Sequence, residues 1–213
     1  LSGSCSLAFY ADDAMYVIDE NNLLVRFNVF DENPGELFYQ AGWNLPPELK
    51  SHTGVEYAEL LDDDKVLIVT SNMAIVVQLE QTSAPLNPLV IDFKEDANLL
   101  FATNATSNFT SADFCHSPCS ENSINESNVN EGLLLLGEES GDVVSFEWNG
   151  NVTESEFTPQ TKMNLLGYAD SIQSVRITDL DESGWSDLLI TTDESANWHH
   201  GQLLKNRISF SVS

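Results

Sequence analysis

Three aspartates, a serine and a glycine are regularly spaced in a nine-residue stretch that runs Asp-Leu-Asp-Glu-Ser-Gly-Trp-Ser-Asp. Oxygen ligands at alternate positions of a tight loop can converge on Ca²⁺, which takes about six to eight oxygens, and the glycine permits the sharp turn. We therefore predict a Ca²⁺ site. Its ligands would be Asp179, Asp181, Ser183, the backbone carbonyl of Trp185, and Asp187. An acidic β-turn without a metal is the alternative.

The segments on either side of this loop are predicted strands. Val175–Thr178 and Leu188–Thr192 are short and rich in β-branched residues, as strands are. Ile190 stands where an EF-hand has its bidentate glutamate, so the loop is not an EF-hand. A Ca²⁺ loop between two strands resembles the FG-GAP/VCBS repeat of extracellular β-propellers, the kind found in integrin α-subunit heads. The resemblance implies an extracellular or cell-surface propeller that contacts proteins or glycans, as in cell adhesion, with a structural Ca²⁺ and no catalysis.

The rest of the chain predicts an all-β fold in which groups of four strands recur. Four blade-like repeats are expected at about 1–48, 49–97, 98–160 and 161–213, within one β-propeller domain or fragment spanning 1–213. The central strands of the rounds are Met15–Ile18, Val66–Val69, Leu133–Leu136 and Leu188–Ile190. Once a polar inserted loop at 103–130 is set aside, their spacing approaches the roughly 40–50 residues of a propeller blade. A β-sandwich with the same hairpins is the alternative.

Two strand assignments define the boundary between the second and third rounds. Leu89–Phe93 is expected to be the fourth strand of the second round, and Asn98–Ala102 the first strand of the third. The turns Asp12-Asp13 and Asp62–Asp64 stand where the Ca²⁺ loop stands in the fourth round. We interpret them as solvated turns, because neither has the spaced aspartates and glycine, with decayed cation loops as the alternative.

The charge is strongly acidic, with 34 Asp and Glu against 8 Lys and Arg, a net charge of −26. The basic residues are scattered singly, whereas nucleic-acid binding needs clustered basic residues. Anionic membrane surfaces are disfavoured for the same reason. No apolar run approaches the roughly 18 residues of a membrane span. The chain begins at Leu1 rather than Met, so we expect a processed chain or a piece of a longer one.

Cysteines and glycosylation motifs favour a secreted glycoprotein. We expect Cys115 and Cys119 to form a small disulfide loop, with Cys5 left over or paired outside the chain; free thiols, or a Zn²⁺ site that includes His116, are the alternatives. Acceptor motifs for N-glycosylation begin at Asn104, Asn108, Asn125 and Asn151. An exoprotein of a marine or halotolerant bacterium is the alternative origin.

Two other functions compete with a non-catalytic contact module. The chain could be a subunit of an extracellular filament or coat that assembles by strand complementation. It could also be a secreted propeller hydrolase, but it lacks the motifs of common hydrolases. All four histidines (His52, His116, His199 and His200) lie in polar, turn-like surroundings. Trp43, Trp148, Trp185 and Trp198 would form a glycan platform only if they are exposed on one face.

Overall fold

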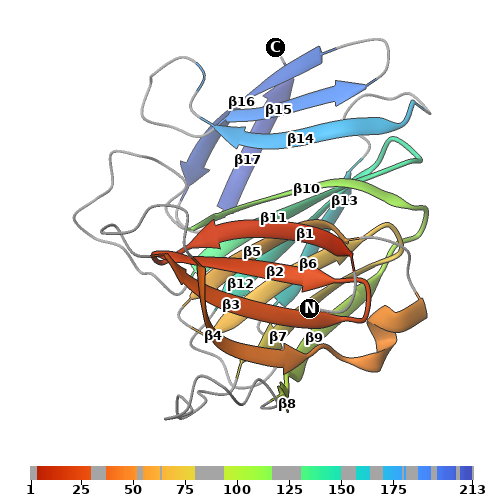
Figure 1. Cartoon of the computed structure of the whole chain (residues 1–213). Helices are drawn as coiled ribbons and strands as arrows, with labels where there is room; N and C mark the ends of the chain where they lie inside the picture. Colours follow the sequence, from red (N-terminus) through yellow and green to blue (C-terminus); the bar gives the residue numbers. More distant parts are fainter. Residues whose placement is uncertain are drawn as a thin grey trace. The chain divides into compact units, whose positions relative to one another are not determined.

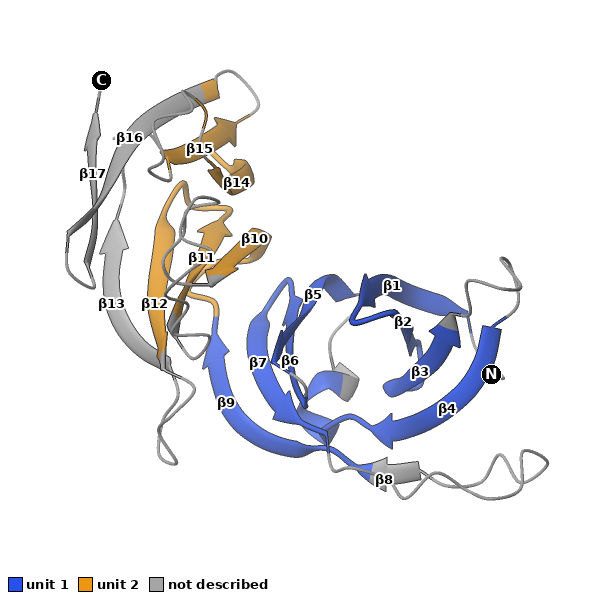
Figure 2. Ribbon diagram, turned by 90° about the vertical axis from the view of Figure 1, so that its left-hand side faces the viewer, with its two compact units in different colours: residues 1–104 blue, residues 105–213 orange. Residues whose placement is uncertain are grey.

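A computed structural model describes most of the 213 residues. The described ranges are 4–29, 37–51, 55–62, 64–79, 94–116, 131–149, 157–163, 170–178, 180, 187–192, 196–204 and 207–212. Within them, every regular element is a β-strand except the 3₁₀ helix η1 (Pro47–Ser51), so the predicted all-β class is confirmed (Figure 1). No helix among these residues is long and apolar enough to span a membrane. The contacts divide the chain into two compact units, Leu1–Asn104 and Ala105–Ser213 (Figure 2).

Unit 1 contains two sheets. The first has the order β1 (Cys5–Ala11), β2 (Ala14–Asp19), β3 (Leu23–Val29), β4 (Leu37–Asn44) and β8 (Lys94–Asp96). The second has the order β5 (Val55–Asp62), β6 (Lys65–Thr70), β7 (Met73–Gln78) and β9 (Asn98–Asn104). Neighbouring strands are antiparallel, except that β8 pairs with β4 in parallel. Each sheet therefore has four antiparallel strands, and the first gains β8, a short fifth strand that lies between β7 and β9 in the chain.

Unit 2 also contains two sheets, and both keep the order of the chain. One consists of β10 (Phe109–His116), β11 (Glu131–Glu138), β12 (Val143–Asn149) and β13 (Phe157–Met163). The other consists of β14 (Ile172–Thr178), β15 (Asp187–Thr192), β16 (Ala196–Leu204) and β17 (Arg207–Val212). All neighbouring pairs are antiparallel. The four-stranded repeat predicted from the sequence is thus present in all four sheets.

The boundary predicted between the second and third repeats is wrong. Asn98–Asn104 forms β9, which pairs with β7, so this strand completes the second sheet instead of opening the third. The third sheet opens with β10, inside the segment 103–130 that was expected to be an unpacked polar loop. Phe109 and Phe114 of β10 are buried, which gives this polar segment enough apolar side chains to pack. The strand expected at Leu89–Phe93 lies outside the described residues.

Each unit is held together by apolar side chains between its two sheets. In unit 1 the core includes Tyr16, Ile18 and Trp43 from the first sheet, and Ile68 and Ile75 from the second. In unit 2 the core between the sheets consists of Leu133, Leu135, Val143, Ile172, Val175, Leu188 and Ile190. Because fully burying one such side chain contributes about 1.5–3 kcal/mol, these clusters are a major source of stability.

The hairpin between β1 and β2 explains one acidic turn. Only Asp12 and Asp13 separate Ala11 from Ala14, which pair with each other, and their φ angles are 48° and 55°. A two-residue loop with positive φ at both positions is a type I′ turn, in which Asp, Asn and Gly are favoured. Backbone geometry therefore accounts for this aspartate pair as a tight turn, and the absence of a cation there stays a prediction.

Replacing Asp13 with glycine is expected to raise the free energy of unfolding by about 0.5–1 kcal/mol, because a side chain in the left-handed region is strained and glycine is not. The gain is partly offset by loss of the contact from the Tyr10 hydroxyl to Asp13 Oδ1, at 3.2 Å. Urea unfolding of the chain and of Asp13→Gly and Asp13→Ala variants tests this. The expected ranking is glycine, aspartate, alanine; a glycine variant no more stable than the alanine variant would contradict it.

Candidate functional site

The predicted Ca²⁺ loop connects two paired strands, as the sequence indicates. β14 and β15 form an antiparallel hairpin, and the pair Thr178 and Asp187 closes the loop between them. Of the predicted ligands, Asp187 is described; Asp179, Asp181, Ser183 and Trp185 lie outside the described residues. The structure therefore fixes the base of the loop and leaves the convergence of its ligands as a prediction.

Asp187, the last predicted ligand, is a buried carboxylate with 1% of its surface exposed. Its Oδ2 accepts a hydrogen bond from the backbone N–H of Leu180, at 3.1 Å, which draws the start of the loop toward its end. A buried carboxylate is costly unless hydrogen bonds or a cation compensate its charge. The donor set of carboxylates, a hydroxyl and a carbonyl has the hard-oxygen chemistry that Ca²⁺ takes. Among the described residues, which include only Asp187 of this donor set, no group of three or more His, Cys, Asp and Glu side chains is arranged to hold a metal.

The acidic turn at 62–64 is paired with a lysine side chain. Lys65 Nζ lies 2.8 Å from Asp62 Oδ2, and Gln78 Nε2 donates to Asp64 Oδ2 at 3.1 Å. Burial acts to raise the pKa of Asp62, but the hydrogen bond and charge of Lys65, with hydrogen bonds from Asp64, outweigh it and hold this pKa below its ordinary value. Lys65 offsets one of the three carboxylate charges of this turn, and its interpretation as an ordinary acidic turn stays a prediction.

A polar network in unit 2 was not anticipated from the sequence. The last residue of β11, just before the turn to β12, is the buried Glu138, whose Oε1 accepts a hydrogen bond from the Thr106 N–H at 2.9 Å. Next to it, the Glu139 N–H donates to the Asn108 carbonyl at 2.8 Å, and Asn108 Nδ2 donates to Glu139 Oε2 at 2.9 Å. These contacts fasten the segment before β10 to the turn. The partners in these contacts are more than 30 residues apart. No local sequence pattern indicates such contacts, because they depend on how the strands pair.

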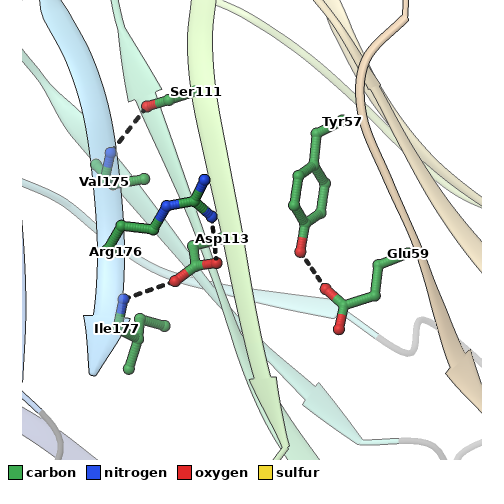
Figure 3. A network of polar contacts seen from close by, with 7 residues as sticks. All are labelled: Tyr57, Glu59, Ser111, Asp113, Val175, Arg176 and Ile177. Carbon is green, nitrogen blue, oxygen red and sulfur yellow. Dashed lines mark hydrogen bonds and ion pairs between the residues drawn. The ribbon is translucent and has the colours of Figure 1, made fainter. Parts of the chain in front are cut away.

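Side chains of β10 also bind the backbone of β14, which belongs to the neighbouring sheet (Figure 3). Ser111 Oγ accepts a hydrogen bond from the Val175 N–H at 3.1 Å, and Asp113 Oδ2 accepts one from the Ile177 N–H at 2.6 Å. Arg176 Nη1 donates to Asp113 Oδ1 at 3.2 Å. We call these contacts of Ser111 and Asp113 with β14 the β10–β14 seam. They satisfy N–H groups at the edge of a sheet, which would otherwise lack partners. The other pair drawn in Figure 3, the Tyr57 hydroxyl and Glu59, belongs to unit 1.

The seam predicts a pH dependence with a defined sign. Burial raises the pKa of Asp113 above its ordinary value, although the Ile177 amide and Arg176 act to lower it. The folded chain therefore holds this proton more tightly than the unfolded chain. The contribution of Asp113 to the free energy of unfolding should fall as pH rises from about 4, the ordinary value for aspartate, through the raised folded value.

We expect Asp113→Asn to remove this part of the pH dependence, since asparagine does not titrate. Urea unfolding at half-unit pH steps from 3.5 to 8 compares the two chains. The stability of the parent chain relative to Asp113→Asn should decrease across the window and then level off. Glu56→Gln, which removes an equal charge at an exposed position of β5, is the matched control for the loss of one carboxylate. A relative stability that rises with pH would contradict the prediction.

The remaining candidates fall in different places. Cys115 is disulfide-bonded and Cys5 is a free, exposed thiol; Cys119 lies outside the described residues. Asn104 and Asn108 are exposed, and Asn125 and Asn151 lie outside the described residues.

His199 and His200 belong to β16, and His116 ends β10, so the turn-like surroundings expected for these three are wrong. His52 is not described. Trp43 and Trp148 are buried, which excludes both from an exposed glycan platform.

No protein-family model and no curated protein matches the chain. Solved structures do match it. The computationally designed Ika4 protein superposes with a TM-score of 0.51 at 8% identity, over 93% of this chain and 91% of that one. The C-terminal WD40 domain of Sif2 has a TM-score of 0.55 at 10% identity, over 92% and 45% of the two chains. The β-propeller domain of Cps50 (Swd1) from Myceliophteria thermophila has a TM-score of 0.52 at 8% identity, over 92% and 51%.

These similarities define the class of fold. The chain is all-β, and its four-stranded antiparallel sheets resemble the blades of β-propellers. Four separate sheets, not two, favour this class over the β-sandwich. The chain spans about half the length of the Sif2 and Cps50 chains that it matches, 45% and 51%. At identities of 8–10%, the similarity concerns the fold alone.

Proposed function

We propose that the chain is a secreted, Ca²⁺-stabilised interaction module of the FG-GAP/VCBS type, which works by contact with other extracellular proteins or glycans and is not catalytic. The observation that carries the proposal is the β14–β15 hairpin with the buried carboxylate of Asp187 at the base of its loop. Asp179, Asp181, Ser183 and the Trp185 carbonyl would supply the other Ca²⁺ ligands.

The role of the metal in this proposal is structural. Asp179, Asp181 and Asp187 bring three negative charges into one short loop, and without a cation these charges repel one another. A ligand that binds only the folded state stabilises it by about 2.7 kcal/mol at one hundred times its Kd. Bound Ca²⁺ would therefore hold the β14–β15 hairpin in one conformation, and through the seam with β10 it would stabilise the neighbouring sheet.

Three further observations support a contact module outside the cell. Cys115 is disulfide-bonded, and structural disulfides persist in oxidising compartments. The acceptor residues Asn104 and Asn108 are exposed, as attachment of a glycan requires. The net charge of −26 favours partners with complementary positive surfaces, because electrostatic complementarity speeds encounter and selects partners.

Thermal unfolding of the purified chain in EGTA, followed by titration with Ca²⁺, tests the proposed function. A stabilisation of about 2–3 kcal/mol at saturation corresponds to a rise in Tm of several degrees for a domain of this size. Asp181→Asn should abolish the rise, because it removes one charged ligand. Glu56→Gln removes an equal charge from an exposed strand position and should retain the full rise.

The two variants separate a specific site from general screening of the acidic surface. An equal response to Ca²⁺ in all three proteins would mean that divalent cations merely screen the net charge, and the loop would then be an acidic turn. A response to Mg²⁺ as large as that to Ca²⁺ would point to the same conclusion. Loss of the response in Asp181→Asn alone supports the proposed site.

A further inference from the structure

β9 is an edge strand among the described residues, and its sequence contains no charged side chain. It is the last strand of the order β5-β6-β7-β9, so in the part of the chain that the structure describes no strand lies on its outer side. Its sequence, Asn-Leu-Leu-Phe-Ala-Thr-Asn, contains no charged residue and no proline, and Leu99 is 41% exposed. Proteins usually block such edges with lysine, proline, a bulge or a cover, because unpaired N–H and C=O groups otherwise recruit strands from other molecules.

A glycan acceptor stands at the end of this edge. Asn104 is the last residue of β9, it is exposed, and the motif Asn104-Ala105-Thr106 is complete. Its side-chain amide makes no hydrogen bond among the described residues. The Thr106 N–H is held by Glu138 at 2.9 Å, which fixes the backbone just after the acceptor. A substituent on Asn104 would project from a defined position without displacing a native contact.

The second described acceptor differs in this respect. Asn108 Nδ2 already donates to Glu139 Oε2, and the backbone carbonyl of Asn108 accepts a hydrogen bond from the Glu139 N–H. The hydroxyl of Thr110, the third residue of its motif, donates to the Gly137 carbonyl at 3.2 Å. A glycan on Asn108 would have to share the amide that fastens the segment before β10. The two acceptors are therefore unequal, and Asn104 is the one that the fold leaves free.

We propose that Asn104 carries an N-linked glycan that guards the β9 edge against pairing with strands of other molecules. A glycan is bulky and strongly hydrated, so it performs at this strand the task that a lysine or proline performs at other edges. This inference rests on the proposed secretion of the chain, because N-glycosylation requires passage through the secretory pathway.

The test uses the full chain secreted from a eukaryotic host, with glycopeptide mass spectrometry at all four acceptors. We expect Asn104 to be occupied. Asn104→Gln and Thr106→Ala both remove this acceptor motif, by different changes, and each should increase the multimeric fraction several-fold in sedimentation velocity. Asn108→Gln is the matched control and should leave it unchanged. Adding Leu99→Lys to Asn104→Gln should restore the monomer, because the lysine protects the edge in place of the glycan.

The outcomes distinguish this inference from the proposed function. A secreted chain with a glycan at Asn125 or Asn151 but none at Asn104 would overturn the proposed role of Asn104. It would not contradict the proposed secretion of the chain. A chain secreted without any glycan would likewise overturn only the role of Asn104, whereas a chain retained in the cell would count against both. If Asn104→Gln lost a glycan but stayed monomeric with an unchanged Tm, Asn104 would be a modification site without the guarding role.

Discussion

Replacing Gly137 with alanine is expected to lower the free energy of unfolding by about 1–3 kcal/mol, the usual cost of overpacking a well-packed site. A Cβ at this position of β11 would lie 2.5 Å from Ile172 Cγ2 and 2.7 Å from Ser111 Oγ. Both neighbours are held in place by other contacts. Ile172 belongs to the core of unit 2, and Ser111 accepts a hydrogen bond from the Val175 N–H in the β10–β14 seam. The added methyl group therefore disturbs the core and the seam together.

Gly42→Ala is the matched control, since it makes the same change within a strand of unit 1. Its Cβ would meet the Tyr39 hydroxyl at 3.2 Å, the far end of a side chain that can move. Urea unfolding followed by tryptophan fluorescence should show a clearly larger loss for Gly137→Ala. Equal losses would mean that Ile172 and Ser111 adjust as readily as Tyr39 does, and the seam would then be less constrained than the structure indicates.

Truncating Leu135 to alanine is expected to cost about 2–5 kcal/mol, the range for buried leucines. Leu135 is fully buried in β11 and belongs to the core between the two sheets of unit 2. Since whole domains are stable by only about 5–15 kcal/mol, this single change should leave unit 2 marginal. The midpoint of urea unfolding is the measurement. Trp148, buried in β12, places a fluorescent reporter within the same unit.

Leu99→Ala deletes the same atoms at a position that is 41% exposed, and it should change stability by less than about 1 kcal/mol, as surface substitutions do. A similar midpoint for Leu99→Ala and Leu135→Ala would show that β11 is not a central core strand. A reduced slope in the Leu135→Ala transition would instead indicate that unit 2 loses its fixed packing before it unfolds.

Local sequence patterns predicted most hairpins, because their determinants lie within a few residues. The strands at 14–18 and 65–70 are apolar on both faces, and each is followed by a short polar turn. The structure confirms both as inner strands with all partners antiparallel. At the β6–β7 turn the Thr70 hydroxyl bonds both the N–H and the carbonyl of Met73, at 3.2 and 3.1 Å, a local contact of the kind that composition signals.

Pairing partners could not be predicted so well, because they depend on which edges are free. β10 has the sequence Phe-Thr-Ser-Ala-Asp-Phe-Cys-His, in which apolar and polar residues are equal in number, and the polar segment around it hides the strand pattern. The sequence predicts β9 as a strand but not its pairing with β7, since adjacency in sequence does not show whether a strand ends one sheet or begins the next. β8 is entirely charged, and its strand conformation depends on the edge that β4 offers.

At the candidate Ca²⁺ site too, local features could be predicted from the sequence and long-range contacts could not. That the aspartate-rich loop joins two paired strands follows from its flanks, and the β14–β15 pairing confirms it. The seam could not be predicted, because Asp113 and Ile177 are 64 residues apart and a serine and an aspartate on a strand carry no signal of their target. The raised pKa of Asp113 likewise depends on burial that only the folded arrangement creates.

The position of β9 also decides where the polypeptide can be cut into expressible pieces. A break after Asn104 separates the two units and leaves two whole sheets in each fragment, with every strand beside its own neighbours. A break at residue 97, where repeat length alone would place it, removes β9 from β7 and exposes an inner strand whose Ile75 and Val76 are fully buried. Fragment design and domain-swap chimaeras should therefore follow strand order and not the period of the sequence.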